Sequence, residues 1–285
     1  MELYKPSVVK EILGRHNLSA KKAFGQNFLI DRNILEKIGA AAGFESGDTV
    51  LEVGPGLGTL GAFFAPLVGK WLAVEIDREL SSQLAAVEEA VPNFTVVYGD
   101  FLKLSLPDLV GEASYKFVAN LPYYITTPII QKILTSRTSW TTMVMMVQWE
   151  VAKRLSAAPG SKDYGALTVF VQYYGSVEVV TRVSRNSFYP APDVDSAVVA
   201  IRRHLKPPVV TASEEHLFKV IRAAFHQRRK TLANSLSKAP YLEISGEQAR
   251  QALNLAGIDL KARAETLSLE QFAHLAEVLY NVECR

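Results

Sequence analysis

Five apolar, β-branched runs follow one another through the first half of the chain. They are separated by stretches long enough for helices, and they cover residues 50–53, 71–76, 94–99, 115–121 and 143–148. Nearly continuous apolar strands that alternate with helix-length connections are typical of a parallel sheet covered on both faces. The pattern therefore predicts a doubly wound, Rossmann-like α/β domain.

Two later segments, 166–183 and 196–203, are also rich in Val, Ile and aromatic residues. No helix-length gap separates strands within them, so we expect antiparallel strands added at the end of the sheet. The sequence Lys206-Pro207-Pro208 then interrupts the pattern, because proline neither donates to a ladder nor continues a helix. We expect one domain over 1–205 and a second over 206–285.

Beyond this boundary the apolar residues recur at helical spacing. They include Leu217, Val220, Ile221, Ala224, Phe225, Leu232 and Leu236, which predict one helix over 214–236, and similar patterns follow at 248–258 and 269–280. The second domain is expected to be small and helical.

Composition indicates an ordinary globular protein, with 48% hydrophobic residues and only 17 Gly and 13 Pro among 285 residues. The single cysteine, Cys284, allows neither an intrachain disulfide nor a Cys-based zinc site. The five histidines show no metal-ligand spacing, so no metal is expected. There is no signal-peptide core and no run of membrane-span length, and we expect a cytoplasmic protein.

The distribution of charge says more about partners than the net charge of +2. Residues 202–230 contain eight Lys or Arg and two Glu, and residues 1–37 contain seven basic and four acidic residues. Such local basic patches favour a nucleic-acid partner, although a solvated charged surface is the more common meaning of either patch.

A glycine-rich turn follows the first predicted strand as Gly54-x-Gly56-x-Gly58. Glycine permits positive φ and lets a ligand approach the backbone, but a tight turn between a strand and a helix is an alternative explanation. The dinucleotide fingerprint requires a third glycine where this chain has Thr59, which disfavours nicotinamide and flavin cofactors. The turn predicts a nucleoside site of another kind.

Two acidic residues follow the next strands. Glu75 ends the second strand, where an acid in such folds accepts hydrogen bonds from ribose hydroxyls. Asp100 follows the third strand and could accept from the amine of a bound adenine, although Gly-Asp is also an ordinary turn pair. Because the carboxyl ends of parallel strands meet at one edge of the sheet, we expect the turn and both acids to share one site.

The tetrapeptide Asn120-Leu121-Pro122-Tyr123 follows the fourth strand. An adenine amine is a poor nucleophile, because its lone pair is delocalised into the ring. The side-chain oxygen of Asn120 and the carbonyl of Leu121 could accept its two hydrogens and expose the lone pair. Pro122 would keep Leu121 extended, and the ring of Tyr123 could stack on the purine. A strand that ends in a simple Asn-Pro loop is the alternative.

From these motifs the chain resembles the ribosomal RNA small-subunit adenine dimethyltransferase family (KsgA/RsmA), which is similar to the Erm methylases. The resemblance covers nearly the whole chain, with FGQNFL at 24–29, EVGPGLGTL at 52–60, VEID at 74–77, GD at 99–100, NLPY at 120–123, QWEVAKRL at 148–155, FYPAPDVDSAV at 188–198 and AFHQRRKTLANSL at 224–236. One departure is Trp149, where the family often has a smaller residue. The resemblance implies a class I methyltransferase sheet and S-adenosylmethionine as the cofactor.

The resemblance also assigns roles to residues. It implies that the cofactor contacts Gln26, Asn27, Leu29, Gly54, Gly56, Glu75, Asp100, Phe101 and Asn120. Phe188 would stack on the target adenine opposite Tyr123, although its spacing fits a core aromatic nearly as well. RNA contacts are expected from one stripe along the predicted helix, formed by Lys219, Arg222, His226 and Arg229. Lys230 borders this stripe. Arg228 falls among the apolar positions of the helix, where it could also pair within the protein.

The activity implied by the resemblance is dimethylation of two adjacent adenosines in the 3′-terminal hairpin loop of 16S rRNA during small-subunit biogenesis. The partner would be 16S rRNA in the small subunit or its precursor, bound by a monomeric enzyme. Two alternatives stay open: an Erm-like enzyme for 23S rRNA, and a non-catalytic RNA-binding assembly factor. The Pro in GPGLG disfavours the first, and the presence of Asn120 and Asp100 disfavours the second.

Overall fold

The computed structural model describes residues 1–15 and 26–283. Cys284, His16, the basic pair Lys21-Lys22 and the first two residues of FGQNFL lie outside the described residues. No helix in the described ranges is long and apolar enough to cross a membrane.

The described chain forms two compact units. The first contains residues 1–152 and 177–203, and the second contains residues 153–176 together with 204–285. The expected division at 205 therefore differs in one respect, because 153–176 joins the second unit. Residues 166–174 form helix α8 (Ala166–Tyr174) and not a strand, and Val169 and Tyr173 lie in the core of the second unit. Packing thus overrides the strand preference of these β-branched and aromatic residues.

The first unit is built on a seven-stranded sheet within the described residues. Its strand order is β4-β3-β2-β5-β6-β9-β7. The strands are β2 (Thr49–Val53), β3 (Lys70–Glu75), β4 (Phe94–Tyr98), β5 (Tyr115–Asn120), β6 (Trp140–Gln148), β7 (Gly175–Val183) and β9 (Ser196–Arg203). Strands β2 to β6 pair in parallel and β9 pairs antiparallel with β6. The doubly wound sheet and the antiparallel strand at 196–203 are confirmed.

The strand order reverses between β2 and β5. The chain moves outward from β2 to β3 and β4, and then crosses to β5 on the other side of β2. In open α/β sheets, ligands bind at such a switch point, beyond the carboxyl ends of the strands. The glycine turn, Glu75, Asp100 and Asn120 all lie at or just after these strand ends, so the topology brings the predicted site residues together.

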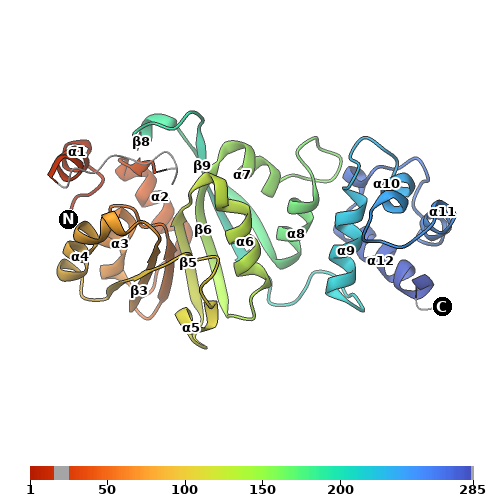
Figure 1. Cartoon of the computed structure of the whole chain (residues 1–285), viewed down its shortest axis with the longest axis horizontal. Coiled ribbons are helices and arrows are strands. Elements are labelled where there is room, and N and C mark those ends of the chain that lie inside the picture. Colours follow the sequence, from red (N-terminus) through yellow and green to blue (C-terminus); the bar gives the residue numbers. More distant parts are fainter. Residues whose placement is uncertain (16–25, 284–285) are drawn as a thin grey trace. The chain divides into compact units, whose positions relative to one another are not determined.

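Helices surround this sheet, as Figure 1 shows around β3, β5 and β6. They are α1 (Pro6–Arg15), α2 (Arg32–Ala42), α3 (Thr59–Phe64), α4 (Ser81–Ala90), α5 (Leu106–Val110), α6 (Thr126–Thr135) and α7 (Trp149–Leu155). A separate two-stranded sheet pairs β1 (Phe28–Leu29) with β8 (Phe188–Tyr189). It ties the start of the chain to the segment that precedes β9.

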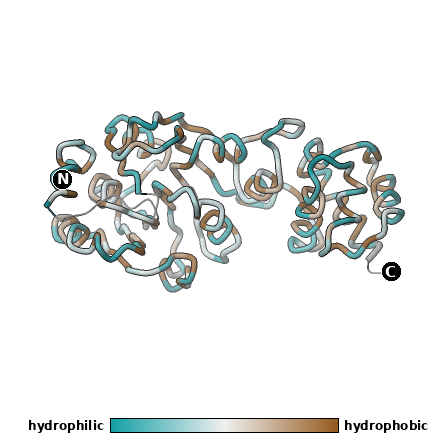
Figure 2. The backbone as a smooth tube through the Cα atoms, turned by 45° about the horizontal axis from the view of Figure 1, so that its top comes forward, coloured by the Kyte–Doolittle hydropathy of each residue, from teal (hydrophilic) through white to brown (hydrophobic). Residues whose placement is uncertain are grey.

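The second unit has its own helical core, as the sequence predicts. After α8 it contains α9 (Glu214–Ala224), α10 (Leu232–Lys238), α11 (Gly246–Leu255) and α12 (Leu269–Glu283). Its helices alternate hydrophilic and hydrophobic stretches in Figure 2, and their buried Leu, Ala and Phe side chains form one cluster.

The single helix expected over 214–236 is wrong. Helix α9 ends at Ala224, and a turn over 225–230 precedes α10. The fully buried hydroxyl of Ser235 donates to Ala223 O (2.9 Å) and accepts from Gln227 N (3.0 Å). A side chain of α10 thus satisfies backbone groups at the end of α9, which stabilises the turn although the apolar spacing continues through it.

Candidate cofactor and substrate site

A cavity opens at the switch point of the sheet, and we call it the switch-point cavity. Its walls come from the N-terminal segment, the glycine turn, the ends of β3, β4 and β5, and the loop after β5. It is lined by Gln26, Asn27, Phe28, Leu29, Glu52, Val53, Gly54, Pro55, Gly56, Thr59, Leu60, Val74, Glu75, Ile76, Gly99, Asp100, Phe101, Leu102, Asn120, Leu121, Pro122, Tyr123, Tyr124 and Ile125. Every residue expected at the cofactor, and the whole NLPY motif, is therefore in this lining.

The glycine turn brings the backbone close to the cavity. Gly54 and Gly56 have φ of +71° and +58°, a region that L side chains rarely adopt. A Cβ on Gly56 would also lie only 3.1 Å from the ring of Phe28. The Gly56 N–H donates to Glu75 Oε2 at 3.3 Å, so the turn and the acid at the end of β3 form one structure.

Backbone groups hold the Glu75 carboxylate in place. Its Oε1 accepts from the N–H of Ile76 (2.9 Å) and of Asp77 (2.8 Å). The residue is 4% exposed, and burial raises its pKa, while these N–H groups and that of Gly56 lower it. A carboxylate positioned in this way can also accept hydrogen bonds from the vicinal hydroxyls of a ribose.

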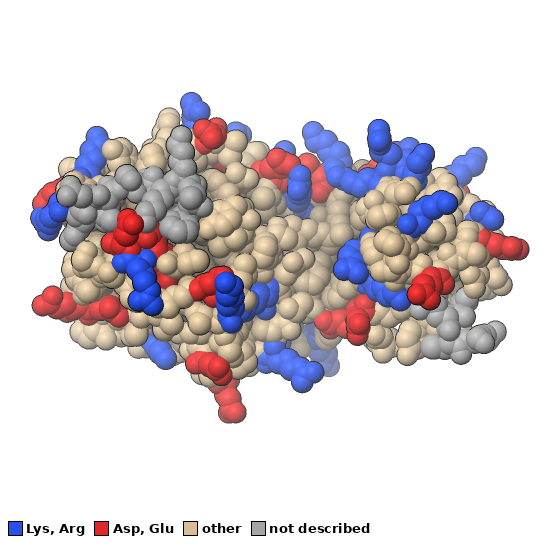
Figure 3. Space-filling model, viewed as in Figure 1, with Lys and Arg blue, Asp and Glu red and all other residues tan. Residues whose placement is uncertain are grey.

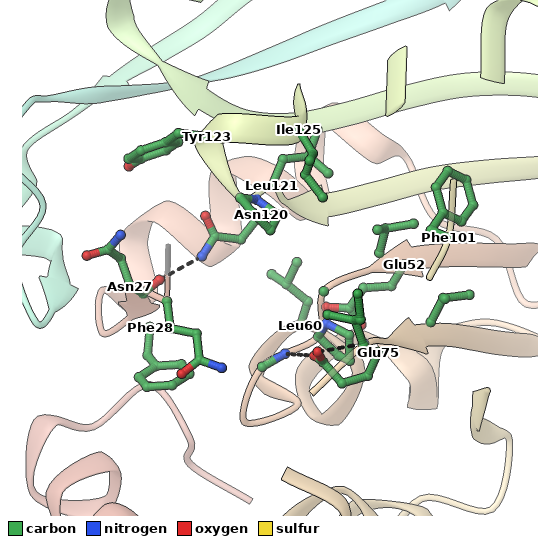
Figure 4. A pocket seen from close by; sticks show the side chains of 18 of the residues that line it. Asn27, Phe28, Glu52, Leu60, Glu75, Phe101, Asn120, Leu121, Tyr123 and Ile125 are labelled. Carbon is green, nitrogen blue, oxygen red and sulfur yellow. Dashed lines mark hydrogen bonds between the residues drawn. The ribbon is translucent and has the colours of Figure 1, made fainter. Parts of the chain in front are cut away.

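Sequence reasoning missed Glu52, a second acid in the cavity lining. It is the last but one residue of β2, is 1% exposed, and accepts a hydrogen bond from Trp71 Nε1 at 2.7 Å. Burial raises its pKa to about 8, and the nearby charge of Glu75 acts in the same direction. The available signal was an acidic residue within the apolar run 50–53. Figure 4 shows both acids on the same side of the cavity.

The loop after β4 carries Asp100 and Phe101 and is anchored by Lys132 of α6. Lys132 Nζ donates to the carbonyls of Phe101 (2.7 Å), Leu102 (3.0 Å) and Leu104 (2.5 Å), and it lies 5.2 Å from the centroid of the Phe101 ring. Asp100 Oδ1 accepts from Leu102 N at 3.0 Å. Lys132 therefore positions the wall expected to hold an adenine, and the sequence pattern did not point to it.

Asn120 at the end of β5 is held in a defined orientation. Its Nδ2 donates to the backbone carbonyl of Asn27 at 2.9 Å, the contact drawn in Figure 4. Since the amide nitrogen is engaged in this way, the Oδ1 atom is the acceptor that the side chain can offer to a ligand. The sequence assigned this role to Asn120 but could not supply its partner.

The rest of NLPY forms a tight turn. Leu121 N donates to Met146 O (3.2 Å), and Pro122 O accepts from Ile125 N (3.2 Å) and from Thr126 Oγ1 (3.1 Å). The Tyr123 hydroxyl and Ser196 Oγ share a hydrogen bond of 2.6 Å, which fixes the ring at its outer end. Burial raises the pKa of Tyr123, so this hydroxyl stays protonated.

Phe188 is not brought into the cavity lining. It is 3% exposed, belongs to the hydrophobic core, and lies opposite Leu29 in the β1–β8 pair. This position agrees with the alternative given by its sequence spacing, that Phe188 is an aromatic residue of the core. Its stacking on a target base stays a prediction.

The residues expected at RNA lie on more than one element of the second unit. Lys219 and Arg222 are on α9, whereas His226, Arg229 and Lys230 lie in the following turn, so the single helical stripe is wrong. Arg222 lies over the Tyr241 ring at 4.2 Å. In Figure 3, Lys and Arg side chains gather over this unit on the face shown.

Arg228 is held within the second unit. Its Nη2 donates to Lys162 O (2.7 Å) and Tyr164 O (3.1 Å). Glu265 lies 3.9 Å away. The internal pairing expected from its apolar register is confirmed.

The chain is similar to known proteins over nearly its whole length. Residues 17–281 match the model of the family described as ribosomal RNA adenine dimethylase. The chain is 48% identical over 282 residues to ribosomal RNA small subunit methyltransferase A of Pelotomaculum thermopropionicum, with 95% of each chain covered. It is 47% identical over 285 residues to the protein of the same name from Geobacillus thermodenitrificans, with 98% and 97% covered.

Two solved structures are also similar. A dimethyladenosine transferase from Plasmodium falciparum matches with a TM-score of 0.71 and 28% identity, over 87% of this chain and 95% of the other. The 23S rRNA methyltransferase ErmE matches with a TM-score of 0.69 and 31% identity, over 89% and 100%. These similarities extend through both units.

Proposed function

The chain belongs to the family of ribosomal RNA adenine dimethylases, and we propose that it transfers methyl groups from S-adenosylmethionine to the exocyclic amines of two adjacent adenosines in the 3′-terminal hairpin loop of 16S rRNA. The observation that carries the chemistry is the fixed amide of Asn120 beside the glycine turn and Glu75 in one cavity. The reaction would take place during biogenesis of the small subunit.

The choice of 16S rRNA over 23S rRNA as the substrate rests on the sequence identity of the chain to its relatives. The two bacterial relatives named small subunit methyltransferase A are 47–48% identical over nearly the whole chain, whereas ErmE is 31% identical. Pro55 of the glycine turn, which Erm turns usually lack, agrees with this choice. A purely non-catalytic RNA-binding factor would have no need for the positioned Asn120 and Asp100.

The residues of the switch-point cavity fit S-adenosylmethionine. Glu75 offers a buried carboxylate to ribose hydroxyls, and Asp100 and Phe101 offer an acceptor and an apolar surface to an adenine. The positive φ of Gly54 and Gly56 lets the cofactor approach the backbone. When bound, the sulfonium supplies an electrophilic methyl group. We propose that Asn27 and Leu29 line the methionine end, and that Gln26 also contacts the cofactor.

Asn120 and the NLPY turn act on the amine that accepts the methyl group. Asn120 Oδ1 and the Leu121 carbonyl accept hydrogen bonds from the two amine hydrogens, which draws the nitrogen toward a tetrahedral geometry and exposes its lone pair. The transferred group needs only proximity and alignment, so a strong base is not required. Tyr123, held by Ser196, offers its ring to the purine. Because a paired base cannot reach the cavity, the adenosine must be unstacked or lie in a loop.

The second unit would contribute to RNA affinity. Its exposed side chains Arg222, Arg229 and Lys230, with Lys219, are suited to phosphates, because Lys and Arg supply the sequence-independent part of such binding. We propose 16S rRNA, in the small subunit or its precursor, as the partner of a monomeric enzyme. This substrate would place the protein in the cytoplasm.

The test is methylation of small subunits isolated from a strain that lacks this gene. The wild-type protein is expected to dimethylate two adjacent adenosines near the 3′ end, located by primer extension. Asn120→Ala is expected to lower kcat by about 100-fold or more, as for the loss of one preorganised polar contact, while it retains cofactor binding. Asn254→Ala, an exposed asparagine on α11, is the matched control. Full activity of Asn120→Ala, or methylation of 23S rRNA in large subunits from the same strain and not of the small subunits, would overturn the proposal.

A further inference from the structure

A second groove lies in the first unit, at the carboxyl end of strand β6. It is lined by Gln148, Trp149, Glu150, Arg182, Arg185, Asp193, Val194 and Asp195, and we call it the Trp149 groove. None of the roles described above uses it. It contains the half-buried indole that departs from the family pattern, together with exposed polar side chains that can donate or accept hydrogen bonds.

The wall of the groove is held by a chain of contacts. The guanidinium of Arg182 lies over the Trp149 ring, 5.2 Å from its centroid, and donates to Asp195 Oδ2 through Nε (3.1 Å) and Nη2 (2.7 Å). The Arg185 N–H donates to Asp195 Oδ1 at 3.1 Å, and Trp149 N donates to Asp195 O at 3.0 Å. The indole is thus fixed on a support before any ligand arrives, which lowers the entropy cost of using it.

Ser196 connects the wall of the Trp149 groove with the substrate side of the switch-point cavity. Ser196, which follows Asp195, is the residue whose hydroxyl pairs with Tyr123. Ser196 also lies directly opposite Gln148 in the β6–β9 ladder, where facing Cα atoms are ~5 Å apart. The Tyr123 ring, which is expected to hold the target adenine, is therefore hydrogen-bonded to the residue that directly follows the groove residue Asp195.

We propose that the Trp149 groove binds the nucleotide next to the target adenosine, with its base against Trp149. The assignment rests on the proposed function, since it takes the target to be one of two adjacent adenosines. When the first-bound adenosine of the pair occupies the switch-point cavity, its neighbour on the side of the groove occupies the groove. The groove thereby contributes to recognition of a pair of unstacked bases.

The chemistry of the groove suits a nucleobase better than a protein or a membrane. An indole offers a flat surface for stacking, and the exposed Val194 adds apolar contact. Asp193 is an exposed carboxylate that can accept from an exocyclic amine, in the way that acidic side chains accept from base amines. Arg182 offsets the charge of Asp195, and the exposed Arg185 can meet a phosphate of the same nucleotide.

The experiment measures binding of the full chain to three RNA hairpins by fluorescence anisotropy. One hairpin carries two adjacent adenosines in its loop, and in each of the others one adenosine is replaced by an abasic nucleotide. Because the strand runs in one direction past the cavity, one of the two replacements removes the base expected in the groove while an adenine remains for the cavity. The proteins are the wild type, Trp149→Phe, Trp149→Ala and Leu67→Ala. Leu67 is an exposed apolar residue of the same unit outside the groove, and serves as the control.

Trp149→Ala is expected to weaken binding to the intact hairpin by about 5- to 150-fold, the range for loss of one stacked base. Trp149→Phe, which keeps a ring, and Leu67→Ala should remain close to the wild type. On the abasic hairpin that lacks the groove base, the wild type should lose affinity by a similar factor relative to the intact hairpin. Trp149→Ala should bind that hairpin as weakly as it binds the intact one. Cofactor affinity, measured by calorimetry, should not change in any variant.

A loss of affinity from Trp149→Ala that is equal on the intact hairpin and on both abasic hairpins would overturn the proposal, and so would the absence of any loss on the intact hairpin. Methyl transfer by the wild-type protein is measured separately on small subunits. Binding that depends on Trp149 and on both bases, without methyl transfer, would contradict the proposed function and leave the groove assignment in place.

Discussion

Replacing Glu52 by Gln should make the stability of the first unit less sensitive to pH. The Glu52 carboxyl is 1% exposed within β2, and its Oε2 accepts from Trp71 Nε1 at 2.7 Å. A glutamine keeps an oxygen acceptor for this bond but carries no titratable proton. The substitution therefore removes the ionisation and preserves most of the shape.

The sign and size follow from the pKa. Burial raises the pKa of Glu52 from an ordinary value near 4.5 to about 8. Between these values the folded protein keeps a proton that the unfolded chain has lost, so the folded state becomes less stable as pH rises. The slope is ~1.4 kcal/mol per pH unit well below the folded pKa and flattens near it. From pH 6 to pH 8 the wild type should lose ~2 kcal/mol relative to Glu52→Gln.

Tryptophan fluorescence during urea unfolding can measure this difference. The chain has three tryptophans, at 71, 140 and 149, and all of them lie in the first unit. The signal therefore reports on that unit alone. The quantity compared is the difference in unfolding free energy between variant and wild type at each pH. Any effect of the substitution that does not depend on pH is the same at both pH values and cancels. Glu45→Gln, at an exposed carboxyl before β2, is the control, and its difference should stay constant.

A Glu52→Gln difference that stays within ~0.5 kcal/mol between pH 6 and pH 8 would refute this reasoning, because the carboxyl would then be ionised in the folded protein at pH 6. The expected result has a functional consequence. A neutral Glu52 beside Glu75 means that Glu52 adds no buried negative charge to the cavity when the cofactor binds.

Three further predictions concern the cofactor wall and the RNA surface. Glu75→Ala should weaken S-adenosylmethionine binding by about 1–3 kcal/mol, the range for hydrogen bonds to a charged group, and an unchanged Kd in calorimetry would place the ribose elsewhere. Lys132→Met should raise the cofactor Kd roughly 10-fold by releasing the loop after β4, with partial recovery in Lys132→Arg and unchanged RNA affinity. An unaltered Kd would show that the loop holds its position without Lys132. Removing Arg222 and Arg229 together should weaken RNA binding and lower the slope of log affinity against log salt by roughly two, whereas an unaltered slope would leave both as solvated surface.

Much of the candidate site could be predicted because it depends on local sequence and on sheet topology. Gly54, Glu75, Asp100 and Asn120 each follow or end a strand that its apolar run identifies. Parallel strands must align their carboxyl ends, so the positions of these residues along the chain were enough to place them in one cavity.

Other parts of the site have no local signal. Lys132 contacts the loop after β4 from a helix about thirty positions further along the chain, and Asn120 meets the carbonyl of Asn27 across 93 positions. Glu52 was hidden within an apolar run, since side chains of a buried strand all read as core. Such contacts depend on side-chain packing, which residue order does not encode in any simple pattern.

By itself the sequence determined the periodicity of strands and helices, the residues at the strand ends, and the motifs that carry the family resemblance. Only the tertiary structure decided that residues 166–174 form a helix in the core of the second unit, and that Ser235 stabilises a turn within the expected helix at 214–236. In both cases the local pattern favoured another conformation. Packing of α8 into the core of the second unit, and the hydrogen bonds of Ser235 to the end of α9, selected the observed one.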